Sequence, residues 1–121
     1  MNIHVDPIGE LAAEGFDPNT VLPAASVDPA APLRFAEAFG DALAKVATAR
    51  ERANIRPTAE VAILKSSGLV NLLIPERFGG LGGSITTALK ILVALSRGDA
   101  SIGALLGYHY TNSGVARLFD V

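Results

Sequence analysis

Residues that start and stop helices recur along this chain, and they constrain its fold more than any other feature of the sequence. Pro32 and Pro57 suit first helical positions, because proline lacks the N–H group that would be unpaired there. Ser84 and Asp99 are favourable N-caps, because their side chains can accept hydrogen bonds from the first turn. These signals predict four helices, over residues 32–52, 57–67, 85–97 and 100–119.

Apolar residues inside these segments recur at helical spacing, which supports the same assignment. In the first segment they share one side, and charged residues take the other. The third segment carries apolar side chains on more than one face, so we expect its helix to be central. The predicted class is therefore all-α, with about four helices and no internal repeats. The expected buried residues are Phe35, Phe39, Leu43 and Val46 in the first helix, and Val61 and Leu64 in the second.

Residues 1–31 differ from the rest, because they hold four prolines and no sustained periodicity. We expect an irregular arm, and the question of whether this arm is disordered in the free chain stays open. The arm lacks the basic start of a secretory signal and the arginines of a mitochondrial transit peptide. No apolar stretch approaches the ~18 residues that span a bilayer. The expectation is a cytoplasmic protein without a membrane partner.

Composition excludes several classes of function. Ten Lys and Arg against twelve Asp and Glu give a net charge of -2, which argues against a general nucleic-acid binder. The chain has no cysteine and only two histidines far apart, so we expect no disulfide, thiolate nucleophile or metal site. Glu60 and Asp99 have first-turn and cap explanations, so we expect no carboxylate pair on an apolar face. The mean hydropathy of +0.37 indicates further apolar contacts with other domains or subunits.

Small residues form a stripe along segment 100–119, and the stripe has two interpretations. Three glycines inside a helix make it weak in isolation, since each costs about 1 kcal/mol relative to alanine. The stripe permits either close packing against another helix or a groove that admits a ligand near the backbone. Its members are Ala100, Gly103, Ala104, Gly107, Thr111 and Gly114.

Hydrogen-bonding side chains cluster beside this stripe. Tyr108 and Asn112 lie one helical turn apart and flank it, so we consider both as candidate ligand contacts. His109 points to another side, where it is either a packed residue or an acid, base or donor. The glycines of segment 79–83 are interpreted as a structural turn, because the Lys-Ser/Thr ending of a phosphate loop is missing.

Residues 64–83 resemble a motif in the amino-terminal domain of the acyl-CoA dehydrogenase superfamily. That motif is a helix, Gly-Leu, a short apolar run and then Pro-Glu-x-aromatic-Gly-Gly-x-Gly. Asp99-Ala100-Ser101 and the small-residue helix after it resemble the next part of the same domain. The resemblance covers about residues 33–121. It implies an acyl-CoA dehydrogenase N-terminal-type helical domain over 32–121, and it implies that a middle β-domain and a C-terminal helical domain are absent from this chain.

Gly107-Tyr108-His109 followed by Thr111-Asn112 is most similar to the flavin-dependent monooxygenase branch, of the dibenzothiophene monooxygenase type. Tyr108 matches a tyrosine near flavin and substrate in that branch. Ala104 stands one turn earlier, where that type has a pocket histidine. The resemblance therefore implies that Tyr108, Asn112, Ala104 and His109 form a wall of the substrate and flavin pocket, and it assigns no catalytic residue to this chain.

The implied function is that of the pocket-forming N-terminal domain of a flavin-dependent oxidoreductase, a monooxygenase using reduced flavin and O2. The implied cofactor is FMN or FAD, held mainly by the absent domains, so the chain alone is expected to be inactive. Implied partners are those domains or a partner chain, further copies in a homo-oligomer, and a flavin reductase. Two alternatives stay open, namely an FAD-dependent acyl-CoA dehydrogenase acting on an acyl-CoA thioester, and a non-catalytic helical interaction module or truncated remnant.

Overall fold

The computed structural model describes residues 16–119 and contains four α-helices over that range. The described residues form no strand, so the predicted all-α class is confirmed. Each predicted helix limit lies within one residue of the observed limit. Two short 3-10 helices fill the connection between the second and third helices. The elements are α2 (Ala31–Arg52), α3 (Thr58–Ser67), η1 (Leu69–Asn71), η2 (Glu76–Phe78), α4 (Ile85–Gly98) and α5 (Ala100–Leu118).

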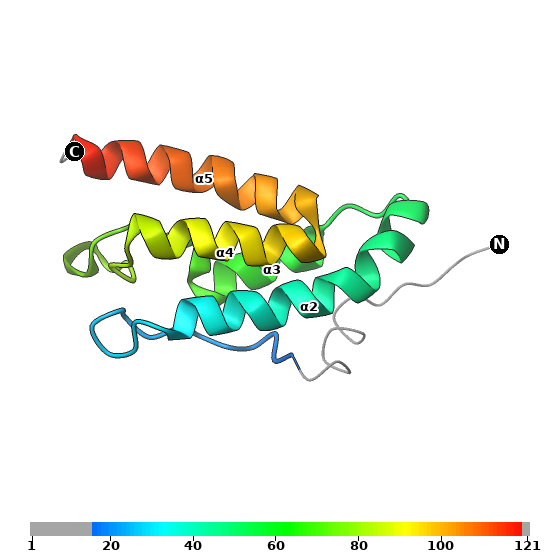
Figure 1. Cartoon of the computed structure of the whole chain (residues 1–121), viewed down its shortest axis with the longest axis horizontal. Helices are drawn as coiled ribbons and strands as arrows, with labels where there is room; N and C mark the ends of the chain where they lie inside the picture. The colour runs from blue at the N-terminus through cyan, green and yellow to red at the C-terminus, as the bar shows by residue number, and fades with distance from the viewer. Residues whose placement is uncertain (1–15, 120–121) are drawn as a thin grey trace.

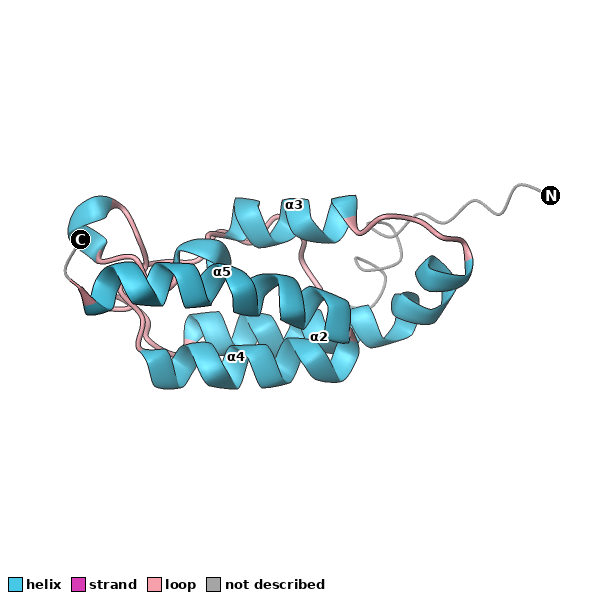
Figure 2. Ribbon diagram, turned by 90° about the horizontal axis from the view of Figure 1, so that it is seen from above, coloured by secondary structure: helices cyan, strands magenta, loops and turns pink. Residues whose placement is uncertain are grey.

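The three long helices lie side by side, with α4 between α2 and α5 (Figure 1). α2 and α4 run in the same direction, and α5 returns antiparallel to α4. The shorter α3 lies along one side of this layer, and it leads into η1 (Figure 2). α4 therefore contacts both long neighbours, which is the central position that its apolar composition predicts.

Every helix contributes to one core, and the predicted stripe of α2 is buried as expected. In α3 the prediction for Leu64 is confirmed, but the prediction for Val61 is wrong, because Val61 is only half-buried. The buried side of α3 follows an i, i+3, i+4, i+7 pattern that begins at Glu60, and Val61 lies about 100° away from its first member. Fully buried large side chains include Phe39, Leu43, Ile91, Leu95, Ile102 and Leu106.

The backbones of α2 and α4 meet closely at two glycines. A Cβ atom on Gly40 would lie 2.3 Å from the carbonyl oxygen of Ala94. A Cβ atom on Gly98 would lie 2.0 Å from the carbonyl oxygen of Gly40. Gly98 therefore permits a close approach as well as ending α4, whereas Gly68 ends α3 in the left-handed conformation, with φ 85°.

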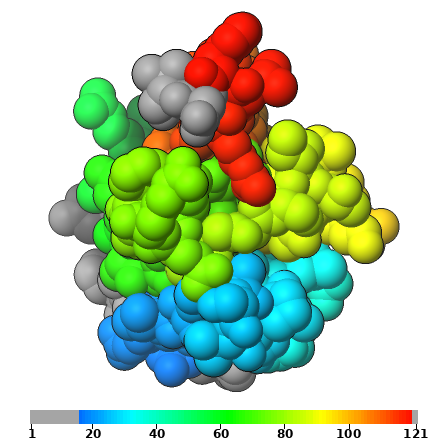
Figure 3. All heavy atoms as spheres, turned by 90° about the vertical axis from the view of Figure 1, so that its left-hand side faces the viewer, coloured from blue at the N-terminus to red at the C-terminus, as the bar shows by residue number. Residues whose placement is uncertain are grey.

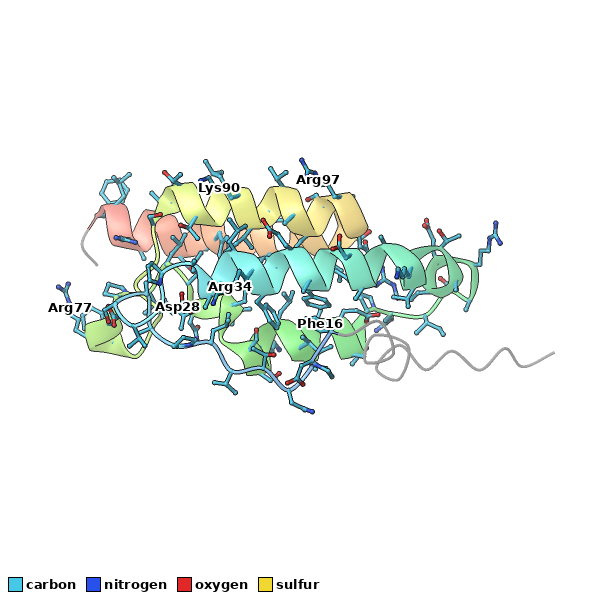
Figure 4. The ribbon with its side chains drawn as sticks, turned by 60° about the horizontal axis from the view of Figure 1, so that its bottom comes forward. Phe16, Asp28, Arg34, Arg77, Lys90 and Arg97 are labelled. Atoms are coloured by element: carbon cyan, nitrogen blue, oxygen red, sulfur yellow. The ribbon has the colours of Figure 1, made fainter. Side chains whose placement is uncertain are left out.

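α4 leaves one apolar side uncovered by the described residues. Ile85, Leu89 and Val93 follow each other at four-residue steps and are 58%, 60% and 54% exposed. Lys90 and Arg97 project from the same helix (Figure 4). Among the described residues, no helix is both long enough and apolar enough to cross a membrane.

The described part of the arm, residues 16–30, has no regular element, yet it packs on the helices. The ring of Phe16 stacks on Phe39 with 4.8 Å between the centroids, beneath α2 in Figure 4. The backbone N–H of Leu22 donates to Ser67 at 2.9 Å. Asp28 and Arg34 form an exposed ion pair, and the hydrogen bond from Arg34 lowers the pKa of Asp28. The predicted arm also includes residues 1–15, which lie outside the described residues.

Candidate functional site

α5 carries all four candidate site residues, and Asp99 fixes where this helix begins. The Asp99 carboxylate accepts from the backbone N–H groups of Ser101 at 2.9 Å and Ile102 at 3.4 Å. This is the predicted N-cap. It satisfies donors of the first turn that would otherwise be unpaired.

Asp99 also belongs to a buried ionic cluster that the sequence did not predict. The Arg50 guanidinium, from the last turn of α2, forms an ion pair with Asp99. Its Nη1 lies 3.4 Å from Oε1 of Glu60, in the first turn of α3. All three side chains are buried, and Glu60 is 0% exposed. The expectation of no carboxylate pair on an apolar face is therefore wrong. The cap and first-turn explanations of Asp99 and Glu60 are local, and they do not explain why both carboxylates are buried and lie next to the same arginine.

The Arg50 cluster joins three elements that are far apart in sequence. A buried charge without its partner is strongly unfavourable, so Arg50 ties the ends of α2, α3 and α5 to one another. One sequence signal was available. Glu60 falls on the same i, i+3, i+4 side of α3 as Ile63 and Leu64, which is a buried position rather than a solvated one.

Two bonds join α5 to the segment after α3. The Tyr110 hydroxyl donates to the carbonyl of Leu69 at 2.7 Å. His109 Nε2 lies 2.7 Å from the carbonyl oxygen of Val70. Burial raises the pKa of Tyr110 well above its ordinary value, so its phenol stays neutral and acts as a structural donor. Tyr110 was not among the predicted site residues.

Two glycines of the small-residue stripe, Gly103 and Gly107, face α4. A Cβ atom on Gly103 would lie 2.0 Å from Oγ of Ser96 and 3.1 Å from its Cβ, so glycine at this position allows α4 and α5 to pack closely. On Gly107 a Cβ atom would lie 3.8 Å from the side chain of Leu92, an ordinary contact. Gly103 and Gly107 therefore pack on α4, whereas Ala100, Ala104 and Thr111 of the stripe are exposed.

Three of the four candidate residues share the opposite, exposed side of α5. Tyr108 is 77% exposed, and Asn112 and Ala104 lie one turn to either side of it. His109 lies about 100° further around the helix, where it contacts Val70. We call the exposed side the outer face, made of Ala104, Leu105, Tyr108, Asn112, Val115 and Phe119.

The outer face combines an apolar surface with two polar groups. A phenol and a carboxamide can each donate and accept hydrogen bonds, so Tyr108 and Asn112 can orient a bound molecule. The face holds no carboxylate, and no group of three potential metal ligands occurs among residues 16–119. The outer face thus combines exposed apolar side chains with a phenol and a carboxamide.

Comparison with known proteins assigns the fold to a family. The family model for the acyl-CoA dehydrogenase N-terminal domain matches residues 34–117. The chain belongs to that family. The matched range runs from the first turn of α2 to the last turn of α5 of this acyl-CoA dehydrogenase N-terminal domain, and no solved structure matches the chain.

The domain is also similar to monooxygenases. It is 37% identical over 87 residues to a dibenzothiophene monooxygenase of Rhodococcus erythropolis, covering 72% of this chain and 21% of that protein. It is 33% identical over 88 residues to SfnC of Pseudomonas putida, a probable FMNH2-dependent monooxygenase, covering 73% of this chain and 22% of that protein. The predicted resemblance to the monooxygenase branch is confirmed. The chain spans about a fifth of the length of these relatives.

Proposed function

We propose that this chain is the pocket-forming N-terminal domain of a flavin-dependent monooxygenase that uses reduced flavin and O2. The observation that carries the proposal is the outer face of α5, where Tyr108 and Asn112 stand one turn apart and exposed among apolar side chains. An apolar face with a few polar groups is the usual composition of one side of a ligand pocket. The similarity to FMNH2-dependent and dibenzothiophene monooxygenases supports the choice of reaction.

The described residues fit one side of a flavin site but not its phosphate end. The glycine segment that follows η2 uses its own amides, since Gly80, Gly82 and Gly83 donate to backbone carbonyls of residues 75, 74 and 72. Those N–H groups are not free to bind a phosphate. The outer face offers an aromatic ring and a carboxamide instead. Our proposal therefore assigns most of the flavin contacts to a β-domain and a C-terminal helical domain, which lie outside the 121 residues of this sequence.

Each residue of the outer face has a distinct part in this proposal. Bound reduced flavin supplies the electrons that activate O2. Tyr108 packs against flavin or substrate and directs its hydroxyl to a polar atom of one of them. Asn112 fixes orientation through its amide. Ala104 offers only a methyl group, so substrate orientation on this side depends on Tyr108 and Asn112. His109 borders the pocket while bonded to Val70.

The proposal extends to cofactor choice and partners. The name of the Pseudomonas putida relative favours FMN, which a separate flavin reductase would deliver in reduced form. The partners are the β and C-terminal domains, in the same polypeptide or in a second chain, and further copies in a homo-oligomer. The exposed apolar side of α4 and the outer face of α5 provide surface for such contacts.

The reaction is tested on the assembly that carries this domain together with its β and C-terminal domains. We expect product formation that requires both reduced FMN and O2, with oxygen incorporated into an organic substrate. Reduction of bound FAD by an acyl-CoA thioester, without any need for O2, would instead identify an acyl-CoA dehydrogenase and refute the proposed reaction.

The role of Tyr108 is tested by a matched pair, because the chain has only two tyrosines. In that assembly, Tyr108→Phe should lower kcat about tenfold and leave the melting temperature unchanged, as expected when one hydrogen bond to a reacting or bound group is lost. Tyr110→Phe should lower the melting temperature and leave kcat unchanged, since its buried hydroxyl donates to the carbonyl of Leu69. Unchanged kinetics and unchanged stability in Tyr108→Phe would remove Tyr108 from the pocket.

A further inference from the structure

A groove of about 310 Å³ lies between α2 and α4, beside the exposed apolar side of α4. Leu33 lines it from α2, and Leu89, Val93 and Ala94 line it from α4. Figure 3 looks along the helices from the end where both begin, and α4 (yellow) and the first turns of α2 (cyan) form adjacent parts of one side of the molecule. No residue of the outer face lines this groove, so the two surfaces are distinct.

The charged residues that line the groove have opposite signs on its two sides. Glu37 lies on the α2 side, and Lys90 and Arg97 lie on the α4 side. All three are exposed, and none of them forms an ion pair with another residue of the described range 16–119. In Figure 4, Lys90 and Arg97 project from α4 away from the other helices. The groove therefore has an acidic side and a basic side, and within that range neither pairs with the other.

Glu37 lies across the groove from the interval between the two cations. α2 and α4 run in the same direction, and a Cβ atom on Gly40 would touch the carbonyl oxygen of Ala94. Glu37 is one turn before Gly40, so it is level with the part of α4 that begins at Lys90. Lys90 and Arg97 are seven residues apart, which is about 10 Å along the helix. The acidic group and the two cations thus occupy the same stretch of the groove.

A second copy of the chain matches this arrangement when it is turned by a two-fold rotation about an axis through the groove. The rotation reverses the direction of the groove and exchanges its sides, so α4 of one copy lies over α2 of the other. Glu37 of each copy then faces Lys90 and Arg97 of the other copy, and this pairing occurs twice. A peptide of a single charge sign would pair with one side of the groove and be repelled by the other side.

The apolar side chains of the groove supply the contact area for the same arrangement. Leu89 and Val93 are 60% and 54% exposed, and both would be removed from water in each copy. The net charge of -2 is small, so two copies repel each other little. Two helices from each copy make a small interface, so we expect a weak dimer with a Kd of about 10 μM.

We propose that a second copy of this chain docks on the groove between α2 and α4, related to the first by a two-fold axis, with Glu37 of each copy paired with Lys90 and Arg97 of the other. The proposal names the surface for one contact of the homo-oligomer, and it rests on that part of the proposed function. It does not depend on the flavin or on the reaction.

Sedimentation equilibrium on the 121-residue chain tests whether the dimer forms. We expect the average mass to rise from 12.5 kDa towards twice that value as the concentration passes about 10 μM. A chain that stays at 12.5 kDa up to about 1 mM would overturn the proposal. The experiment contains no flavin and no substrate, so this outcome would leave the proposed reaction unaffected, and failure of the reaction would leave the dimer unaffected.

A matched pair of leucine variants locates the contact. Leu89 lines the groove and Leu105 lies on the outer face, and both are exposed residues inside helices. Leu89→Gln should raise the Kd of the dimer about tenfold or more, whereas Leu105→Gln should dimerise like the unmodified chain. Circular dichroism checks the fold of each variant. A dimer that survives Leu89→Gln and is lost in Leu105→Gln would place the second copy on the outer face and refute the assignment.

Exchange of the charges tests the pairing itself. Glu37→Lys makes both sides of the groove basic, and the double variant Lys90→Glu with Arg97→Glu makes both sides acidic. Each variant alone brings like charges together at both contacts, so we expect its Kd to rise about tenfold or more. An equimolar mixture restores opposite charges at both contacts, so we expect a heterodimer at least as tight as the original dimer. A mixture that stays monomeric, or either variant dimerising alone like the unmodified chain, would refute the pairing.

Discussion

Replacing Gly40 with alanine tests the close contact between α2 and α4. Gly40 lies inside a helix of 22 residues, where helix propensity alone predicts that alanine stabilises the fold by about 1 kcal/mol. The structure predicts the opposite sign. The new Cβ atom would lie 2.3 Å from the carbonyl oxygen of Ala94 and 3.1 Å from its carbonyl carbon. Both are backbone atoms, so no side chain can rotate away.

The size of the effect follows from that distance. Ordinary contact of a Cβ atom begins at 3.4 Å, so α2 and α4 must separate by about 1 Å. A gap of about 1 Å forfeits up to half of the dispersion energy of the contacts across it. Overpacking costs about 1–3 kcal/mol, and a backbone obstruction belongs at the upper end. When the gain in helix propensity is subtracted from this cost, we expect the free energy of unfolding to fall by about 2 kcal/mol, which lowers the melting temperature by about 10 °C.

The assay is urea denaturation followed by circular dichroism, with Gly107→Ala as the control. Gly107 also lies inside a helix, but its Cβ atom would only reach the Leu92 side chain at 3.8 Å. Gly107→Ala should therefore raise the free energy of unfolding by about 1 kcal/mol, through helix propensity alone. A Gly40→Ala chain as stable as the unmodified one would refute the close contact and the helix arrangement derived from it.

Two further predictions concern buried polar groups. Arg50→Met leaves Glu60 and Asp99 buried without their cation, so we expect the free energy of unfolding to fall by about 3–5 kcal/mol in the same urea denaturation assay. Arg34→Met removes an exposed ion pair and should leave the denaturation midpoint unchanged. Equal midpoints for the two variants would contradict the buried cluster. Burial raises the pKa of Tyr110 above its ordinary value of 10.0, so as the pH rises the unfolded chain releases this phenolic proton before the folded chain does. The stability due to the protonated Tyr110 is therefore fully present below about pH 10 and is lost as the pH rises further. Denaturation midpoints across that range should fall more steeply for the unmodified chain than for Tyr110→Phe, and parallel profiles would contradict the burial.

The helix limits were predictable because their signals are local. Ser84 accepts from the Thr87 N–H at 3.1 Å, and Gly68 takes the left-handed conformation that ends α3. Such bonds join residues a few positions apart, so spacing along the sequence is enough to find them. The common exposed side of Tyr108 and Asn112 follows from helical geometry in the same way.

The contacts that were not predicted join residues distant in sequence. Gly40 and Gly98 meet only once α2 and α4 lie side by side, and neither glycine carries a local sign of that contact. Arg50 finds Asp99 and Glu60 because three helices end at one place. Local spacing gave Glu60 and Asp99 only first-turn and cap explanations, since it has no information on which helices become neighbours.

The central claim is that the outer face of α5 borders the flavin and substrate pocket, and site-specific alkylation tests it most directly. The described domain has no cysteine, so a single cysteine at Asn112 is a clean reporter, with Asp41→Cys on the exposed side of α2 as the control. In the assembly that includes the β and C-terminal domains, alkylation is measured by mass spectrometry with and without FMN and substrate. The account predicts that the ligands slow alkylation at Asn112→Cys and leave Asp41→Cys unchanged. Equal rates at Asn112→Cys with and without saturating ligands would contradict it.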